Sequence, residues 1–160
     1  MAAGRTLIDG VYKRIKGGNM LVGGVSKKIK CGKVLIDGIE RTISFPAPIP
    51  VTITTSAGLH YKEEYAYVVY NGKNHYPGET LTIESWDVVK VVVKASKAGS
   101  GISTKMRIEL NGEIVVRGTT DTSQISYDYT PSANATSATI DLFNAQSLSG
   151  TAFGAKITEE

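Results

Sequence analysis

The stretch 65-YAYVVYNG-72 shows most directly how this chain folds. Its first six residues are aromatic, small or β-branched, and aromatic and β-branched residues favour strands. The Asn-Gly pair at 71–72 suits a two-residue type I′ turn, because both positions there need a positive φ. We therefore predict a β-hairpin, with Tyr65 and Tyr67 on one face of its first strand and Val68 and Tyr70 on the other.

The pattern around this hairpin continues through the second half of the chain. A second Asn-Gly pair lies at 111–112, between two further alternating runs. Short runs with strand character cover residues 51–55, 65–70, 80–84, 88–93, 105–110, 113–116, 125–129, 138–143 and 152–157. No run has a convincing helical period. We predict an antiparallel β-sandwich over 51–160, immunoglobulin-like in architecture only, because a single cysteine excludes the cysteine pair of antibody domains.

Residues 46–50 separate this half from the first. They read Pro-Ala-Pro-Ile-Pro, and alternating prolines stiffen the backbone and remove hydrogen-bond donors. We predict a short linker here. Upstream, residues 1–45 form an arm in which one motif recurs three times at a step of 14 residues. Gly4, Gly18 and Gly32 align, and so do the apolar positions that follow them.

Each copy in the arm should form two strands of four to six residues. The turns fall at Asp9-Gly10, Gly23-Gly24 and Asp37-Gly38, which again permit positive φ. Three such copies could stack as a hairpin meander or as coils of a β-solenoid, and the sequence leaves both open. The copies contain few bulky apolar residues, and units of two or three short strands form only a marginal core.

The arm is therefore predicted to gain stability from a partner. We expect oligomerisation with copies of itself around a symmetry axis, or docking on another protein, with packing on its own C-terminal domain as the alternative. The predicted arm interface consists of Leu7, Ile8, Val11, Ile15, Leu21, Val22, Val25, Ile29, Leu35, Ile36, Ile39 and Ile43.

Charge is unevenly distributed along the chain. The net charge is +3, yet residues 1–45 carry nine Lys or Arg against three Asp or Glu. A basic arm can bind nucleic acid, but these residues sit at repeat positions without interleaved aromatic side chains, so we do not predict nucleic acid as a partner. Cationic side chains on short strands also deter edge-to-edge stacking. No apolar run is long enough to span a bilayer or to form a signal peptide, so we expect no membrane association.

At this point the sequence resembles a known group. Units of the form G-x-x-L-[IV]-x-G-[VI]-x-x-x-I, from Thr6-Leu7-Ile8-Asp9-Gly10 through Ile43, followed by an all-β domain with a Tyr-Val-Val-Tyr-Asn-Gly hairpin, resemble small virion proteins of tailed phages and prophages of Gram-positive bacteria. The resemblance implies glycine-rich repeats ahead of an immunoglobulin-like module, with a structural role in the tail, baseplate or capsid exterior. It implies no catalytic residues.

The residues themselves do not point to an enzyme. His60 and His75 have no metal-ligand spacing, no serine lies in a GxSxG elbow, and the two phosphate-loop motifs are absent. The carboxylates of Glu63 and Glu64 should point to opposite faces of a strand and so act separately. We predict no catalytic site, no metal and no cofactor.

One segment has the composition of a binding surface. Residues 59–78 contain five of the eight tyrosines, namely Tyr61, Tyr65, Tyr67, Tyr70 and Tyr76. Tyrosine rings suit stacking on a sugar or a protein interface, but tyrosine is also a good strand former. Trp86 is expected to be a core anchor of the sandwich.

These observations predict a non-enzymatic structural component of a phage particle, assembled in the bacterial host cytoplasm and located in the virion. The arm would bind sister copies or other virion proteins. The alternative is a glycan-binding, host-attachment module that uses the tyrosine-rich hairpin.

Overall fold

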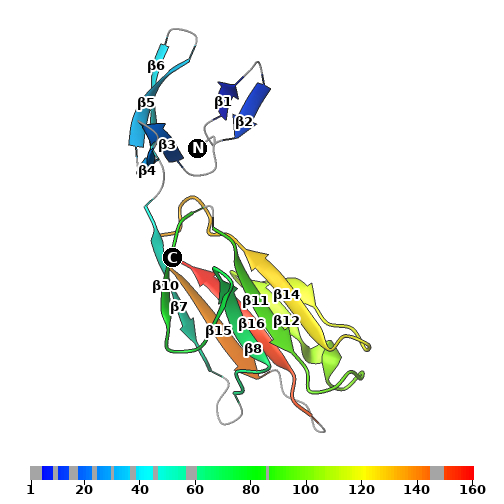
Figure 1. Cartoon of the computed structure of the whole chain (residues 1–160). Helices are drawn as coiled ribbons and strands as arrows, with labels where there is room; N and C mark the ends of the chain where they lie inside the picture. The colour runs from blue at the N-terminus through cyan, green and yellow to red at the C-terminus, as the bar shows by residue number, and fades with distance from the viewer. Residues whose placement is uncertain are drawn as a thin grey trace.

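The computed structural model describes residues 47–56, 61–85, 87–144 and 150–160, and the backbone of six short strands within residues 5–44. In the part of the chain described in full, ten strands between Ile49 and Glu159 form two sheets (Figure 1). The fold is all-β, as the sequence predicts. One 3₁₀ turn, η2 (Ser103–Lys105), interrupts the strands.

The larger sheet has six strands. In spatial order they are β10 (Thr80–Ile83), β7 (Ile49–Thr54), β15 (Ala138–Asn144), β16 (Phe153–Glu159), β12 (Arg107–Leu110) and β13 (Glu113–Arg117). The smaller sheet has four strands, in the order β14 (Gln124–Tyr129), β11 (Val89–Lys94), β8 (Ala66–Tyr70) and β9 (Lys73–His75). Alternate residues of both sheets are buried in one cluster, which is the arrangement of a β-sandwich.

The prediction of a purely antiparallel sandwich is wrong in the six-stranded sheet. β15 pairs with β7 in parallel, and β12 pairs with β16 in parallel. Parallel neighbours need a long connection, and here most of the domain lies between β7 and β15. Alternation of apolar and polar residues identifies strands and their buried faces. It carries no information about which strands become neighbours in a sheet.

Both Asn-Gly hairpins are confirmed. Asn71 and Gly72 have φ of 50° and 74°, and they join β8 to β9. Asn111 and Gly112 have φ of 50° and 88°, and they join β12 to β13. The residues of β9, the second strand of the first hairpin, were not identified from the sequence, because Lys73–His75 are polar and carry no alternation.

The predicted linker at 46–50 overlaps the first strand of the sandwich. β7 begins at Ile49, which is buried in the core. Proline is accommodated at the second residue of this strand because Pro50 is exposed and the pairing with β15 begins one residue later, at Val51. Only the start of the Pro-Ala-Pro-Ile-Pro segment is therefore available as a spacer.

Six strands lie in residues 5–44. They are β1 (Arg5–Ile8), β2 (Val11–Arg14), β3 (Gly18–Val22), β4 (Val25–Ile29), β5 (Cys31–Ile36) and β6 (Ile39–Ser44). They pair as three separate two-stranded antiparallel sheets, β1 with β2, β3 with β4 and β5 with β6 (Figure 1). The pairs beside each two-residue connection are Ile8↔Val11, Val22↔Val25 and Ile36↔Ile39. Each pair is shifted by 14 residues from the last, so the register is the same in all three copies.

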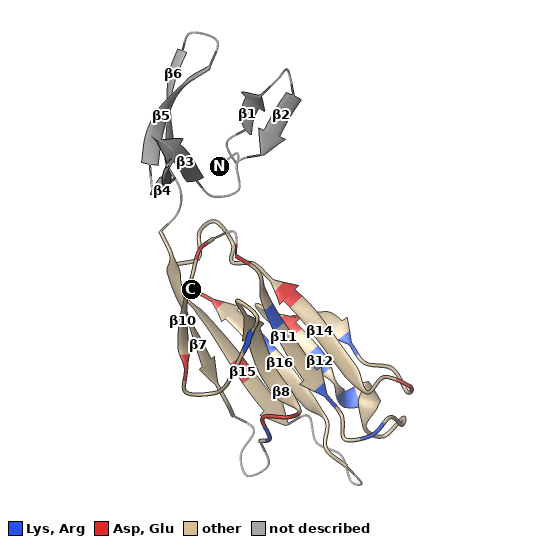
Figure 2. Cartoon of the chain, viewed as in Figure 1, with Lys and Arg blue, Asp and Glu red and all other residues tan. Residues whose placement is uncertain are grey.

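In the fully described ranges no helix has the length and hydropathy required to cross a membrane. Figure 2 shows Lys and Arg interspersed with Asp and Glu over the sandwich.

Candidate ligand-binding surface

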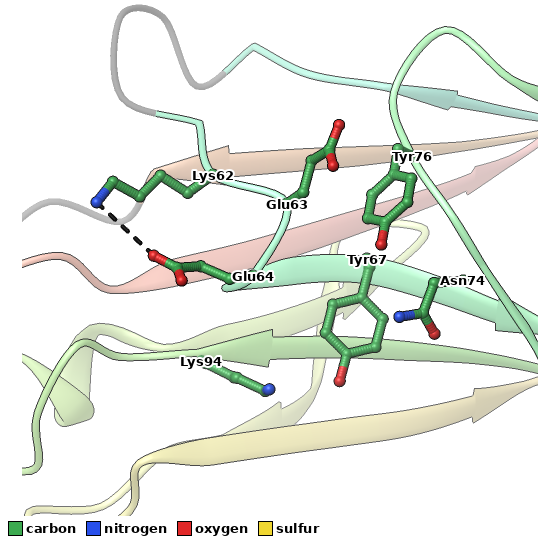
Figure 3. Close-up of a pocket in the computed structure, with 7 residues that line it drawn as sticks. All are labelled: Lys62, Glu63, Glu64, Tyr67, Asn74, Tyr76 and Lys94. Atoms are coloured by element: carbon green, nitrogen blue, oxygen red, sulfur yellow. Dashed lines mark ion pairs between the residues drawn. The ribbon is translucent and has the colours of Figure 1, made fainter.

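An open depression of about 700 Å³ lies beside the tyrosine-rich hairpin (Figure 3). Its lining comes from the turn before β8, from β8 itself, from β9 and the turn after it, and from the end of β11. The lining residues are Lys62, Glu63, Glu64, Tyr67, Asn74, Tyr76 and Lys94. We call this feature the tyrosine depression.

Tyr67 reaches the depression through the alternation of β8. Ala66 and Val68 are buried in the core, so the residue between them points to the outer face of the four-stranded sheet. Across the sheet, Tyr67 pairs with Val92 of β11. Val92 is only 3% exposed, although it lies outside the core cluster that contains Val91 and Val93. On the outer face of this sheet, Tyr67 therefore lies next to a buried apolar residue.

Tyr76 is held by a turn that follows β9. Gly78 has a φ of 97°, and the Glu79 amide donates to the Tyr76 carbonyl at 3.2 Å. The Tyr76 amide in turn donates to Oε1 of Glu79 at 2.8 Å, and Oε2 of that carboxylate lies 2.9 Å from Nδ1 of His75. These hydrogen bonds, first from His75 and then from Tyr76, lower the pKa of Glu79. The tyrosine is thus placed by its backbone, while its side chain faces the depression.

Charged groups of both signs surround the two rings. The amide of Tyr65 donates to the Lys62 carbonyl at 3.0 Å, which forms a turn that presents Glu63 and Glu64. These two glutamates therefore lie in a turn and not in a strand, which corrects the predicted geometry of the pair. Lys62 Nζ is 3.7 Å from Oε1 of Glu64.

Lys94 approaches Tyr67 from the neighbouring strand. Its Nζ lies 5.2 Å from the centroid of the Tyr67 ring, a cation–π distance. One face of Tyr67 is therefore already occupied. The other ring of the depression, Tyr76, has no cation–π partner or ring contact among the described residues.

The other three tyrosines of the segment lie elsewhere. Tyr61 meets Phe153 edge-on at 6.1 Å, and Tyr65 stacks on the same ring at 6.0 Å. Tyr65 precedes β8 and packs against the core, so it does not share an outer face with Tyr67 as predicted. The reason is that the strand begins at Ala66, and the alternation does not extend back into the turn.

Hydrogen bonds fix two of these core-facing tyrosines. Tyr61 donates its hydroxyl to the Ala66 carbonyl at 2.6 Å, and Tyr70 donates to Oδ2 of Asp87 at 2.6 Å. Burial is the main cause that raises the pKa of both hydroxyls, and nearby carboxylates add to it. Only Tyr67 and Tyr76 of the five predicted residues thus line one surface.

Some predicted residues lie outside the described part of the chain. His60 and Trp86 are not described, and neither is Ile15. The remaining residues of the predicted arm interface lie in β1–β6, where the structure describes the backbone and not the side chains. His75 is described, and it contacts Glu79 in the turn after β9.

The sequence reasoning did not find Asn74, Lys62 or Lys94 as members of this surface. They come from three different elements, and only the pairing of β9 with β8 and of β11 with β8 brings them together. One signal was present in the run 88–93, where Lys90 and Val92 alternate with buried valines and mark a second, outward face.

Chemically, the tyrosine depression offers aromatic rings beside hydrogen-bonding groups. The carboxylates of Glu63 and Glu64 accept hydrogen bonds, the ammonium of Lys94 donates them, and the amide of Asn74 does both. In the described ranges no group of three or more His, Cys, Asp and Glu side chains is placed to hold a metal ion. Comparison with protein-family models, curated proteins and solved structures gives no match.

Proposed function

We propose that this protein is a non-enzymatic structural component of a phage particle, in the tail, the baseplate or the capsid exterior. In this proposal residues 1–45 bind sister copies or other virion proteins, and the sandwich faces outward. The displayed domain is immunoglobulin-like only in being a two-sheet sandwich, since its six-stranded sheet contains two parallel pairs. The motif resemblance of the repeats supplies the link to virions.

The observation that carries the assembly role is the set of three hairpins with one register. Each hairpin is a two-stranded sheet, which is marginally stable at best on its own. The sandwich, by contrast, has a core cluster drawn from both of its sheets. Hairpins of equal register that recur every 14 residues along the sequence offer equivalent strand edges, which suits association with equivalent elements on other copies.

Light scattering coupled to size-exclusion chromatography tests this role on the full chain. We expect a defined oligomer for the wild type. Replacing the three equivalent leucines, in the triple variant Leu7→Ser, Leu21→Ser and Leu35→Ser, should reduce the oligomer to monomer, because these positions belong to the predicted interface.

The matched control changes three equivalent polar positions of the same repeats. It is the triple variant Lys13→Ser, Lys27→Ser and Arg41→Ser, which should keep the oligomer. The leucine variant should also be incorporated poorly into particles, whereas the control variant should be incorporated as the wild type is. A monomeric wild-type chain, with incorporation unaffected by the leucine changes, contradicts the assembly role.

A second candidate function is glycan binding, and one observation favours it. Tyr67 and Tyr76 come from different elements and line the same depression. Aromatic rings beside hydrogen-bonding groups suit a sugar, whose ring has both apolar C–H faces and hydroxyls. Binding of the full chain to a broad glycan array tests this candidate, and a blank array removes it. Glycan binding is compatible with a location in the virion.

A further inference from the structure

We infer that the tyrosine depression takes a neutral pyranose glycan, stacked on Tyr76 and hydrogen-bonded by Glu63, Asn74 and Lys94. This inference rests on the second candidate function above and goes further by naming the ligand class and the role of each residue. It is carried by four features of the depression, namely its unused aromatic surface, its mixed donors and acceptors, its charge balance and its open shape.

The first feature is aromatic surface that the fold does not use. Tyr61, Tyr65 and Tyr70 pack against the hydrophobic core, whereas Tyr67 and Tyr76 are absent from that set. Lys94 covers one face of Tyr67. Tyr76 is therefore the ring best placed to receive the apolar face of a ligand. The hydrogen bonds of its backbone to Glu79 hold it in place before any ligand arrives.

The second feature is the set of polar groups around that ring. Figure 3 shows Glu63 near Tyr76, and Asn74 and Lys94 on either side of Tyr67. Each hydroxyl of a pyranose both donates and accepts, so adjacent hydroxyls are satisfied by a carboxylate together with an amide or an ammonium group. The lining supplies all three kinds. A purely apolar ligand would leave these groups desolvated and unpaired.

The third feature is charge balance, which selects among glycans. The lining contains two lysines and two glutamates. Lys62 and Glu64 form an ion pair at 3.7 Å, which leaves Glu63 and Lys94 as one group of each sign. On the same sheet face, Lys90 pairs with Asp128 at 3.6 Å. An acidic sugar would need an excess of positive charge, and the depression has none, so a neutral sugar is favoured.

The fourth feature is the open shape of the depression. Enclosed pockets bury most of a small ligand, whereas an open surface contacts only one side of it. A sugar unit within a longer chain could lie across the rings while the chain continues past both ends. We therefore expect recognition of an internal or terminal unit of a polymer and not of a free monosaccharide.

The test uses the full-length protein. An array of neutral, acidic and amino-sugar oligosaccharides identifies the preferred class, and calorimetric titration with the best oligosaccharide follows. We expect neutral oligosaccharides to bind and acidic ones to bind weakly or not at all. Tyr76→Ala should weaken binding by about tenfold, because it removes the aromatic ring on which the sugar stacks. Tyr76→Phe keeps the ring and should stay within about twofold of the wild type.

A neighbouring pair on β9 supplies the matched control. Asn74→Ala should weaken binding severalfold, while Lys73→Ala, the adjacent exposed residue outside the lining, should not. Exclusive binding of acidic or amino sugars overturns the inference while glycan binding itself stands. Neutral binding that is unchanged in Tyr76→Ala also overturns it. A blank array overturns both this inference and the glycan candidate, and it leaves the assembly role to its own test.

Discussion

The hydroxyl of Tyr129 offers the sharpest test of how the sandwich is closed at its C-terminal strand. Tyr129 is fully buried and donates to Oε1 of Glu159 at 3.0 Å. The amide of Ser132 donates to the same oxygen at 2.8 Å. The amide of Glu159 donates to Oδ1 of Asn111, in the turn between β12 and β13, at 2.9 Å. One carboxylate thus joins β14 of one sheet to β16 of the other.

The substitution Tyr129→Phe removes this hydroxyl and keeps the ring, so no cavity forms. A hydrogen bond to a charged group contributes about 1.5–3 kcal/mol to the free energy of unfolding. The bond from Ser132 remains, so the carboxylate keeps a partner and the lower end of that range applies. We expect a loss of about 1.5 kcal/mol at neutral pH.

The pH dependence of this loss follows from the carboxylate. Burial opposes the ionisation of Glu159, but hydrogen bonds from Ser132, Tyr129 and Asn111 outweigh it and hold its pKa below the usual value. A lowered pKa in the folded state stabilises the fold above the unfolded pKa of about 4.3, and this contribution disappears as the pH falls through the folded pKa. The effect of Tyr129→Phe should therefore be largest at pH 7 and smaller at pH 3.

Urea unfolding of the wild type and of Tyr129→Phe at both pH values measures this difference. Tyr127→Phe is the matched control, because Tyr127 lies on the same strand and is only partly buried. The control should change the free energy of unfolding by less than about 0.5 kcal/mol. A loss in Tyr129→Phe that is the same at pH 7 and pH 3, or no larger than that of the control, would refute the reasoning.

Two further predictions concern the free energy of unfolding, and a third concerns the pKa of Glu79. A Cβ at Gly118 would overlap the backbone oxygen of Ser103, which cannot move aside as a side chain could, so Gly118→Ala should destabilise the fold by about 2 kcal/mol or more in urea unfolding. Phe153→Ala removes a fully buried ring and should lower the free energy of unfolding by about 3–5 kcal/mol in the same assay. His75→Ala should return the pKa of Glu79 toward its usual value, because the His75 hydrogen bond is the main cause that lowers it, and carboxyl NMR titration measures this.

The sequence predicts most reliably those features that depend on a few adjacent residues. Both Asn-Gly turns form because only certain residues accept positive φ, and this preference acts within the dipeptide itself. The parallel pairs β7–β15 and β12–β16 join residues far apart in the chain, and no local pattern encodes them. The bulge in β13 is also not encoded locally. It arises because Ile108 and Glu109 of β12 pair with Val116 and Ile114, which leaves Val115 without a partner residue in β12.

The candidate surface was predictable only in part, because local composition marks the region but not the strand boundaries or the strand pairing. Tyrosine enrichment over residues 59–78 pointed to the region that supplies most of the lining of the tyrosine depression. Sorting those tyrosines required the residue at which β8 begins, and strand ends are poorly defined by local preference. Because β8 begins at Ala66, Tyr65 stacks on Phe153, and of the two tyrosines within β8 only Tyr67 points outward. Lys94 joined the site through the pairing of β11 with β8, which the sequence did not predict.

The two parts of the chain use the same strand chemistry and differ in how burial is achieved. In the sandwich, two sheets cover each other, so pairing and burial are satisfied together. In residues 5–44 two residues separate the paired strands of each copy, and the three pairs share one register. Burial is a separate requirement that a two-stranded sheet does not meet by itself. In the proposed assembly, equivalent hairpins of other copies would supply that burial, which is the reason to look for this chain in an assembly.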